Sequence, residues 1–220
     1  ITAGGGESQP LRVTATSSST GLIPNPTVTY TTANATGSIA FTPVTDQSGT
    51  ATITVTVEDG GLDGNLSTAG DNATFSRTFD VTVNPLNDTP TLNAISNLTI
   101  DEDAAQQTVS LAGISAGGGE SQPLRVTSTS SNTGLIPNPA VTYSTANTTG
   151  SLAFTPVTDQ SGTATITVTV EDGGLDGNLS TAGDNATFSR TFDVTVNAVN
   201  DAPTLNALSN VSIDEDASEQ

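Results

Sequence analysis

Apolar and polar residues alternate along several short runs of the chain. In Thr50–Asp59 every second residue is apolar and threonine fills most positions between, and Thr78–Asn84 alternates in the same way. Because successive side chains of a strand point to opposite faces, this pattern predicts strands with one buried face. Further runs of this kind are Leu11–Ala15, Thr27–Thr31, Ser38–Val44, Leu98–Ile100 and Thr108–Ala112. Clusters of Gly, Pro, Asn, Ser and Asp separate the runs, and no stretch keeps a helical period, so the fold is predicted to be all-β.

The sequence repeats itself after 113 residues, the offset between Ile1 and Ile114. Residues 1–107 and 114–220 differ at 15 aligned positions, and Ala40–Asn84 is identical to Ala153–Asn197. Self-similarity at a fixed period indicates an array of like units. About seven short strands in a 113-residue unit are typical of an immunoglobulin-like β-sandwich. The Cys and Trp of antibody domains are absent, so only the architecture is predicted.

The ends of the chain do not coincide with the ends of this unit. If a unit begins at the phrase "NDTP", the complete sandwich spans residues 87–199. Residues 1–86 then form a sandwich repeat that lacks its N-terminal strands, and residues 200–220 hold the first strands of a third repeat. We interpret the whole as a window on a longer array. The open sandwich at 1–86 would need a strand from elsewhere, because an unpaired sheet edge invites association.

The charge of the chain is strongly one-sided. It has 23 Asp and Glu, four Arg, no Lys and no His, for a net charge of −19. Nucleic acid is excluded as a partner because neutralising phosphates requires clustered cations. An anionic membrane surface is disfavoured for the same reason, and no apolar run is long enough to cross a bilayer. A surface so acidic repels itself when compact, and bound multivalent cations are one remedy.

Several residue types that carry catalysis are missing. Without His, Cys and Lys there is no imidazole base, thiol nucleophile, zinc site, disulfide or Lys–Asn crosslink. Paired carboxylates could in principle hydrolyse glycosides, but such a site needs aromatic residues to hold the sugar. The chain has two Tyr, six Phe and no Trp. We therefore expect no enzyme activity.

The acidic residues follow the ends of the predicted strands. Antiparallel neighbours reverse direction, so acids before the penultimate strand and acids after the last strand lie at the same end of a sandwich. Stacking units end to end then brings acidic groups from both sides to each junction. At the first junction the predicted group is Asp46, Asn87, Asp88, Glu171 and Asp172. At the second it is Asp101, Glu102, Asp103, Asp159, Asn200 and Asp201. Glu58 and Asp59 occupy the corresponding place at the top of the first unit, facing a preceding one.

Oxygen ligands of this kind suit Ca²⁺, which takes about six to eight oxygens at roughly 2.3–2.6 Å. Mg²⁺ demands a stricter octahedron and keeps its waters, so it fits less well. The competing interpretation of the Asn-Asp pairs is a proline-terminated turn in which Asp caps its own backbone. For the "DED" at 101–103 it is a solvated strand end whose charges protect a sheet edge. The loop Asp59–Asn72 is predicted to be mainly a solvated turn, with a second metal site as the alternative.

The phrases "FTPVTDQSGTATITVTVEDGG" and "TFDVTVNAVNDAPTL" resemble the cadherin-like and immunoglobulin-like tandem repeats of giant bacterial surface adhesins. The resemblance covers essentially the whole chain and implies calcium between the domains. By position, the calcium ligands of cadherins correspond to Asn200 with Asp201, the Asp101–Asp103 cluster, Asp159, and Glu171 with Asp172. The sequence departs from that pattern twice. One Asp stands where an acidic pair is expected before the penultimate strand, and "AGGGESQ" replaces an Asp-x-Asp, leaving only Glu7 and Glu120 there.

Three functions follow as hypotheses. The first is a non-catalytic stalk or spacer segment of a large extracellular adhesin or surface protein, made rigid by Ca²⁺ at the junctions between repeats. Its partners would be neighbouring repeats of the same chain. The second is a subunit of a self-assembling extracellular filament or surface layer, a homopolymer built by strand exchange. The third is an accessory binding module of a secreted enzyme, which an exposed aromatic platform would favour. All three place the chain outside the cell.

Overall fold

The computed structural model describes residues 1–32, 34–68 and 70–219, and these residues form strands, turns and loops without a helix. No segment among them is a helix with the length and apolarity needed to cross a membrane. The prediction of an all-β fold is confirmed. The strands are β1 (Leu11–Ser17), β2 (Thr27–Thr29), β3 (Ser38–Ala40), β4 (Gly49–Asp59), β5 (Thr74–Val83), β6 (Leu98–Asp101), β7 (Gln107–Ala112), β8 (Leu124–Ser130), β9 (Ala140–Thr142), β10 (Thr149–Phe154), β11 (Gly162–Asp172) and β12 (Thr187–Asn197).

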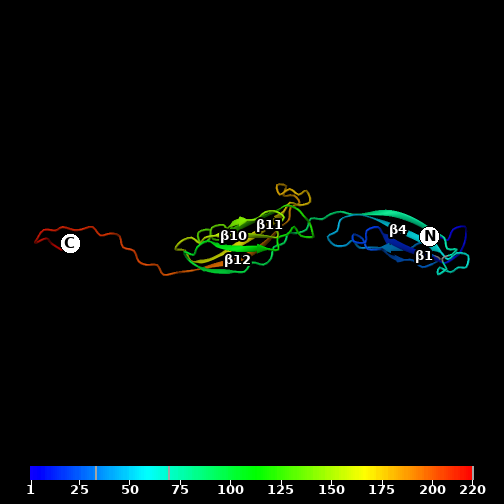
Figure 1. The fold of residues 1–220 in the computed structure, drawn as a ribbon, viewed down its shortest axis with the longest axis horizontal. Helices are drawn as coiled ribbons and strands as arrows, with labels where there is room; N and C mark the ends of the chain where they lie inside the picture. The colour runs from blue at the N-terminus through cyan, green and yellow to red at the C-terminus, as the bar shows by residue number, and fades with distance from the viewer. Residues whose placement is uncertain (33, 69, 220) are drawn as a thin grey trace.

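Strands β6 to β12 form two sheets, in the orders β6-β12-β11-β8 and β7-β10-β9. Strands β1 to β5 form two smaller sheets, β1-β4-β5 and β2-β3. Figure 1 shows the two groups of strands following one another along the long axis, with the C-terminal segment extending beyond the second group. Each strand of β1 to β5 has a counterpart 113 residues later, whereas β6 and β7 have none among the described residues. The division of the chain after residues 86 and 199 stays a prediction, and residue 220 lies outside the described residues.

The second group of strands encloses a continuous apolar core. Ala164, Ile166, Val168 and Val170 alternate along β11 and are completely buried. Leu111 and Leu152 from the opposite sheet, and Phe192 and Val194 from β12, belong to the same core. The threonines between the buried residues of β11 lie on the outer face, as the alternation predicts.

The segment that enters the second sandwich crosses from one sheet to the other. Thr91 forms an isolated bridge with Ser115, three residues after β7, and the backbone N–H of Asn93 donates to the carbonyl of Ala112, the last residue of β7, at 3.0 Å. The chain then pairs through β6 with β12 in parallel, with Leu98 opposite Val194. Because parallel strands end at the same side of a sheet, Asp101 and the residues after it lie beside the exit from β12.

The same sequence is buried to different extents in the two groups of strands. Phe79 is 41% exposed and Phe41 is 38% exposed, whereas their counterparts Phe192 and Phe154 are 2% and 4% exposed. The residues around them are identical in the two copies, so the difference comes from β6 and β7, which cover only the second copy. The core formed by β1 to β5 is therefore open on the side of β3 and β5.

This difference predicts unequal costs for one substitution made in two places. Phe192→Ala should destabilise its sandwich by about 3–5 kcal/mol, because it removes a buried ring from a closed core. Phe79→Ala should cost well under half of that, since water already reaches the ring. Urea unfolding of dilute protein, with hydrogen exchange to assign each transition to β1–β5 or β6–β12, measures both costs. Equal costs would show that Phe79 is covered in solution.

Candidate metal centres at the acidic junctions

Three carboxylates meet where the chain leaves β12, and we call them the carboxylate cluster. Asp103 follows β6, Asp159 lies in the loop between β10 and β11, and Asp201 follows β12. Each offers one oxygen, and the three oxygens lie within 4.8 Å of one another. The backbone N–H of Asp159 donates to Oδ1 of Asp103 at 3.3 Å, which fixes the loop against the end of β6.

No cation of the protein neutralises this cluster among the described residues. In the part of the chain that the structure describes, the ion pairs are Arg12 with Glu58 and Arg125 with Glu171. Neither pair includes a member of the carboxylate cluster. Partial desolvation and then the charges of Asp103 and Asp201 raise the pKa of Asp159. Three negative groups held this close repel one another, so a cation between them would be favoured electrostatically.

The three acids of "DED" have different surroundings. Asp101 lies on the exposed side of β6 and accepts a hydrogen bond from Asn197 Nδ2 at 3.1 Å. Glu102 is only 8% exposed, and its Oε1 accepts from the backbone N–H of Val199 at 2.6 Å. Glu102 therefore fastens the exit from β12 to the end of β6, and Asp103 alone of the three belongs to the carboxylate cluster.

Two members of the cluster have a left-handed backbone. The φ angles of Asp103 and Asp159 are 65° and 57°, and Asp46, the counterpart of Asp159, has a φ of 58°. Residues other than glycine rarely adopt this conformation, although Asp tolerates it better than most. The loop conformation before the penultimate strand is thus the same in both copies.

The first junction is built around Asn87. Its Nδ2 donates to Oδ1 of Asp172 at 3.2 Å and to the carbonyl of Asp184 at 2.9 Å, while its Oδ1 accepts from Gln122 Nε2 at 2.6 Å. Asp172 is completely buried. One linker amide therefore contacts the end of β11, the loop before β12 and the loop before β8. We call Asn87, Gln122 and Asp172, together with the neighbouring loop residue Asn185 that contacts Glu171, the Asn87 junction.

Three oxygens of the Asn87 junction lack a partner within the described part of the chain. They are Oδ2 of Asp172, Oε1 of Gln122 and Oδ1 of Asn185, and each is buried. Buried polar atoms are normally paired, because leaving water without a compensating bond costs free energy. The unpaired atoms are all oxygens, which are the ligands of hard cations and also acceptors for bound water. Gln9 Oε1 and Asn72 Oδ1, the equivalents of two of these atoms in the first copy, are unpaired as well, so Asp172 Oδ2 is what distinguishes this junction. The donor types present are those that bind Ca²⁺.

Acids from both sandwiches and from the linker line one cavity. Asp46, Asp88 and Glu120 are among the residues that line a space of about 580 Å³. The backbone N–H of Asp88 donates to Oε2 of Glu120 at 3.2 Å. A Cβ at Gly118 would lie 2.0 Å from Oδ2 of Asp88, so the glycine-rich loop lets the linker approach this closely. The loop that departs from the cadherin pattern thus still brings one carboxylate, Glu120, to the junction.

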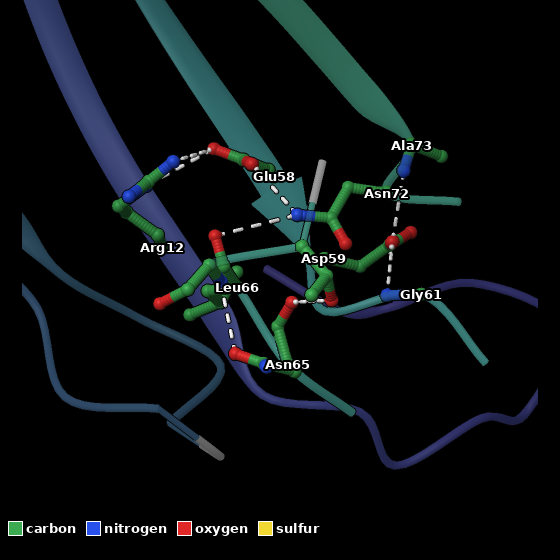
Figure 2. A network of polar contacts seen from close by, with 10 residues as sticks. Arg12, Glu58, Asp59, Gly61, Asn65, Leu66, Asn72 and Ala73 are labelled. Atoms are coloured by element: carbon green, nitrogen blue, oxygen red, sulfur yellow. Dashed lines mark hydrogen bonds and ion pairs between the residues drawn. The ribbon is translucent and has the colours of Figure 1, made fainter. Parts of the chain in front are cut away.

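The acids at the ends of the penultimate strands have local partners. Glu58 accepts hydrogen bonds from Arg12 and from Asn72 Nδ2, and the Asn72 bond, followed by Arg12, lowers its pKa. Asp59 accepts from the N–H groups of Gly61 and Ala73, at 3.0 and 2.9 Å. Figure 2 shows both carboxylates within this network. These partners all belong to the first sandwich, so Asp59 organises the loop that follows β4. Asp172 accepts from the equivalent N–H groups of Gly174 and Ala186 and, in addition, from Asn87 of the linker.

The structure brings together some of the predicted ligands and separates others. Asp103, Asp159 and Asp201 converge at the second junction, and Asn87 contacts Asp172 at the first. Glu171 instead pairs with Arg125 and with Asn185 Nδ2, as Glu58 does with the equivalent residues. Asn200 is exposed, and its Nδ2 donates to the Asp201 carbonyl at 3.2 Å. Gln122 and Asn185 were not predicted at the junction, because their uncharged amides form no distinctive pattern in the sequence.

Several solved structures resemble this chain at low sequence identity. Domains 1–6 of the surface-layer protein SbsC match with a TM-score of 0.38 and 18% identity, over 86% of this chain and 20% of that one. The EC1-2 segment of human mucin-like protocadherin matches with a TM-score of 0.44 and 13% identity, over 86% and 85% of the two chains. An endo-fucoidan hydrolase of glycoside hydrolase family 107 matches with a TM-score of 0.35 and 18% identity, over 87% and 24%.

The chain therefore spans about a fifth of the solved segment of the surface-layer protein, domains 1–6, that it resembles. No protein-family model matches the sequence. No curated protein matches it either.

The raised pKa of Asp159 predicts how the metal-free junction responds to pH. A carboxyl whose pKa is higher in the folded than in the unfolded state contributes stability below its unfolded pKa, and this contribution is lost as pH rises through the folded pKa. The ¹³C shift of the Asp159 carboxyl, followed by NMR in chelator, should titrate with a pKa above the ordinary value for Asp. In Asp103→Asn the midpoint should move down, because a neighbouring negative charge is removed. An unchanged midpoint would mean that the two carboxylates lie apart in solution.

Asn87→Ala should destabilise the second sandwich by about 1–3 kcal/mol, because it leaves the buried Asp172 carboxylate with fewer donors. Asn200→Ala is a matched control, since Asn200 occupies the same place in the repeat but is exposed. Its substitution should change stability by less than about 0.5 kcal/mol. Urea unfolding measures both. Similar effects for the two variants would contradict the role assigned to Asn87.

Proposed function

We propose that this chain is a non-catalytic stalk segment of a large extracellular surface protein, and that Ca²⁺ bound at the junctions between sandwiches stiffens it. The observation that carries the proposal is the convergence of Asp103, Asp159 and Asp201 at the place where the chain leaves a sandwich. Such a spacer would hold a binding domain away from the cell. Its partners are the neighbouring repeats of the same chain.

The carboxylate cluster supports a metal role because its three members come from separate parts of the chain. Asp201 belongs to the linker, whereas Asp103 and Asp159 belong to the sandwich above it. An ion held by all three would tie the direction of the linker to the sandwich. Without an ion, repulsion among the carboxylates acts in the opposite direction and favours a linker that moves away. Glu102 supplies a further, metal-independent contact through Val199.

The first junction supports the proposal through its unpaired oxygens. A cation near Asp172 Oδ2 and Gln122 Oε1 would compensate atoms that are buried without a donor. The amide of Asn87 already connects the linker to this place. Ca²⁺ fits better than Mg²⁺ because the donors are a mixture of carboxylates and amide carbonyls in irregular loops, which suits a flexible, oxygen-rich coordination shell.

The remaining chemistry of the chain favours a passive role. It has no His, Cys or Lys that could serve as base or nucleophile. The strongly negative surface also favours a location where calcium is abundant, which is outside the cell. Binding of calcium to the folded junction alone would stabilise the protein by mass action, by an amount that grows with the logarithm of the calcium concentration.

Calcium titration of the whole chain tests this function. In millimolar Ca²⁺ the melting temperature should rise by several degrees over that in chelator, and small-angle scattering should show a narrower distribution of lengths. Asp159→Asn and Asp201→Asn should each weaken calcium binding at the second junction at least tenfold, as measured by isothermal titration calorimetry. The sandwich itself should remain folded by circular dichroism in both variants.

Glu219→Gln is the control, because it removes the same charge from an exposed position outside the junctions. It should leave calcium affinity within about twofold of the unaltered chain, since screening weakens distant surface charges. A melting temperature and a length distribution indifferent to Ca²⁺ would rule the metal out. Equal losses in Glu219→Gln and Asp201→Asn would mean that calcium responds only to net charge.

A further inference from the structure

We propose that the sheet β1-β4-β5 binds residues 204–216 of a second copy of this chain, which pair with β5 as β6 pairs with β12. The outcome is head-to-tail association by strand exchange. The inference goes beyond the proposed stalk and does not require metal. It rests on a comparison within these residues, because the same strand is present as β12, which pairs with β6, and as β5, which pairs only with β4 in the part of the chain that the structure describes.

The accepting surface is the open side of the first group of strands. Among the described residues β5 pairs only with β4, whereas its counterpart β12 pairs with both β11 and β6. Phe75 and Phe79, both on β5, are 61% and 41% exposed. Since Phe192, the counterpart of Phe79, is 2% exposed, this surface is an uncovered core and not an aromatic platform for a ligand. Burying it is strongly favourable.

The donating segment carries the matching apolar residues and exposes them. Residues 200–219 contain no strand, and Figure 1 shows the C-terminal segment lying away from both sandwiches. Leu205, Leu208, Val211 and Ile213 are exposed by 83%, 81%, 77% and 60%. Their counterparts in the second sandwich belong to the core or pack against it, and these are Leu92, Ile95, Leu98 and Ile100.

The register of the exchange follows from the existing pair. Val194 lies opposite Leu98 and Asn197 opposite Asp101 in the parallel ladder. Subtracting 113 from the β12 residues and adding 113 to the β6 residues places Val81 opposite Val211 and Asn84 opposite Asp214. Residues Val81 to Asn84 are identical to Val194 to Asn197, so the accepting edge offers the same backbone groups and side chains.

The polar contacts that fasten β6 can also be repeated. In the second sandwich the Asp193 N–H donates to Asn97 Oδ1 at 2.9 Å, and Asn197 Nδ2 donates to Asp101 Oδ1 at 3.1 Å. Arg190 Nε donates to the Leu92 carbonyl at 3.2 Å. All six residues have identical counterparts in the exchange, which are Asp80, Asn84 and Arg77 on the accepting side and Asn210, Asp214 and Leu205 on the donating side.

Part of the donating segment already has its bound conformation. The N–H of Ala217 donates to the Asp214 carbonyl at 3.3 Å, and Asp216 has a φ of 62°. In the second sandwich Ala104 donates to the Asp101 carbonyl at 3.2 Å, and Asp103 has a φ of 65°. The turn after the donated strand is therefore formed before docking, which lowers the entropy cost of binding.

Exchange would also place Asp216 of the second copy beside Asp46 and Asp88. These three residues are the counterparts of Asp103, Asp159 and Asp201, the carboxylate cluster. This consequence alone rests on the proposed function: if the cluster binds calcium, calcium should strengthen the exchange. Two copies that each carry a charge of −19 repel each other, so added monovalent salt should strengthen it in any case.

Cysteine crosslinking tests the register directly, because the chain has no cysteine of its own. Thr195 lies opposite Thr99 in the existing pair, so the exchange places Thr82 opposite Ser212, with both side chains exposed on the outer face. Neighbouring strands are about 4.8 Å apart, within reach of a disulfide. Thr82→Cys and Ser212→Cys proteins, prepared separately, mixed and oxidised, should give a product of twice the chain mass. Thr78→Cys mixed with Ser212→Cys is the control, since it lies about 13 Å further along the same face of β5.

The proposal expects at least a tenfold excess of crosslinked dimer for Thr82→Cys over Thr78→Cys, in chelator as well as in calcium. It also expects concentration-dependent association of the unaltered chain in light scattering, which Val211→Asp with Ile213→Asp abolishes. Equal crosslinking of the two mixtures, or a monomer at all concentrations, would overturn it. So would a Thr82→Cys, Ser212→Cys double variant that crosslinks only within one chain. Crosslinking that is unaffected by calcium would support the strand exchange and would contradict calcium binding by Asp46, Asp88 and Asp216.

Discussion

The parallel pairing of β6 with β12 is the contact on which both the core and the acidic junction depend. It places Leu98 and Ile100 against the core, and it ends both strands at the same side of the sheet. The acids after β6 therefore meet the linker after β12, although 98 residues separate Asp103 from Asp201. An antiparallel partner at this edge would have delivered "DED" to the opposite end of the sandwich.

The two copies of the repeat show how far local sequence determines local structure. The loop of Asp46 and that of Asp159 have the same left-handed residue, and Arg12 and Arg125 make the same ion pair. Burial differs in spite of this identity, as Phe79 and Phe192 demonstrate. Backbone conformation and short-range polar contacts are thus determined by the repeated sequence itself. The closed core depends in addition on β6 and β7, which pair only with the second copy.

Much of the fold could be predicted from the alternation of residues, because Thr and Val at a period of two in Thr50–Asp59 have one compatible environment. The path of residues 91–101, which contact the sheet of β7 first and then pair with β12, could not be predicted. It depends on which sheet edges the other strands leave unpaired. At the junctions, the order of the strands was enough to place Asp103, Asp159 and Asp201 near one another. It was not enough to foresee that Glu171 pairs with Arg125, because that contact joins neighbouring strands whose register was unknown. The amide of Gln122 was missed since an uncharged side chain in a glycine-rich loop has no distinctive pattern.

The direction of β6 relative to β12 also determines how a sandwich resists being pulled. The chain enters through the segment before β6 and leaves after β12, so tension along the long axis acts on these two strands from opposite ends (Figure 1). Because they are parallel, the tension slides one strand past the other, and the hydrogen bonds of the ladder share the load instead of breaking one after another. A tether assembled from such units would resist stretching through its backbone, whatever ions its joints hold.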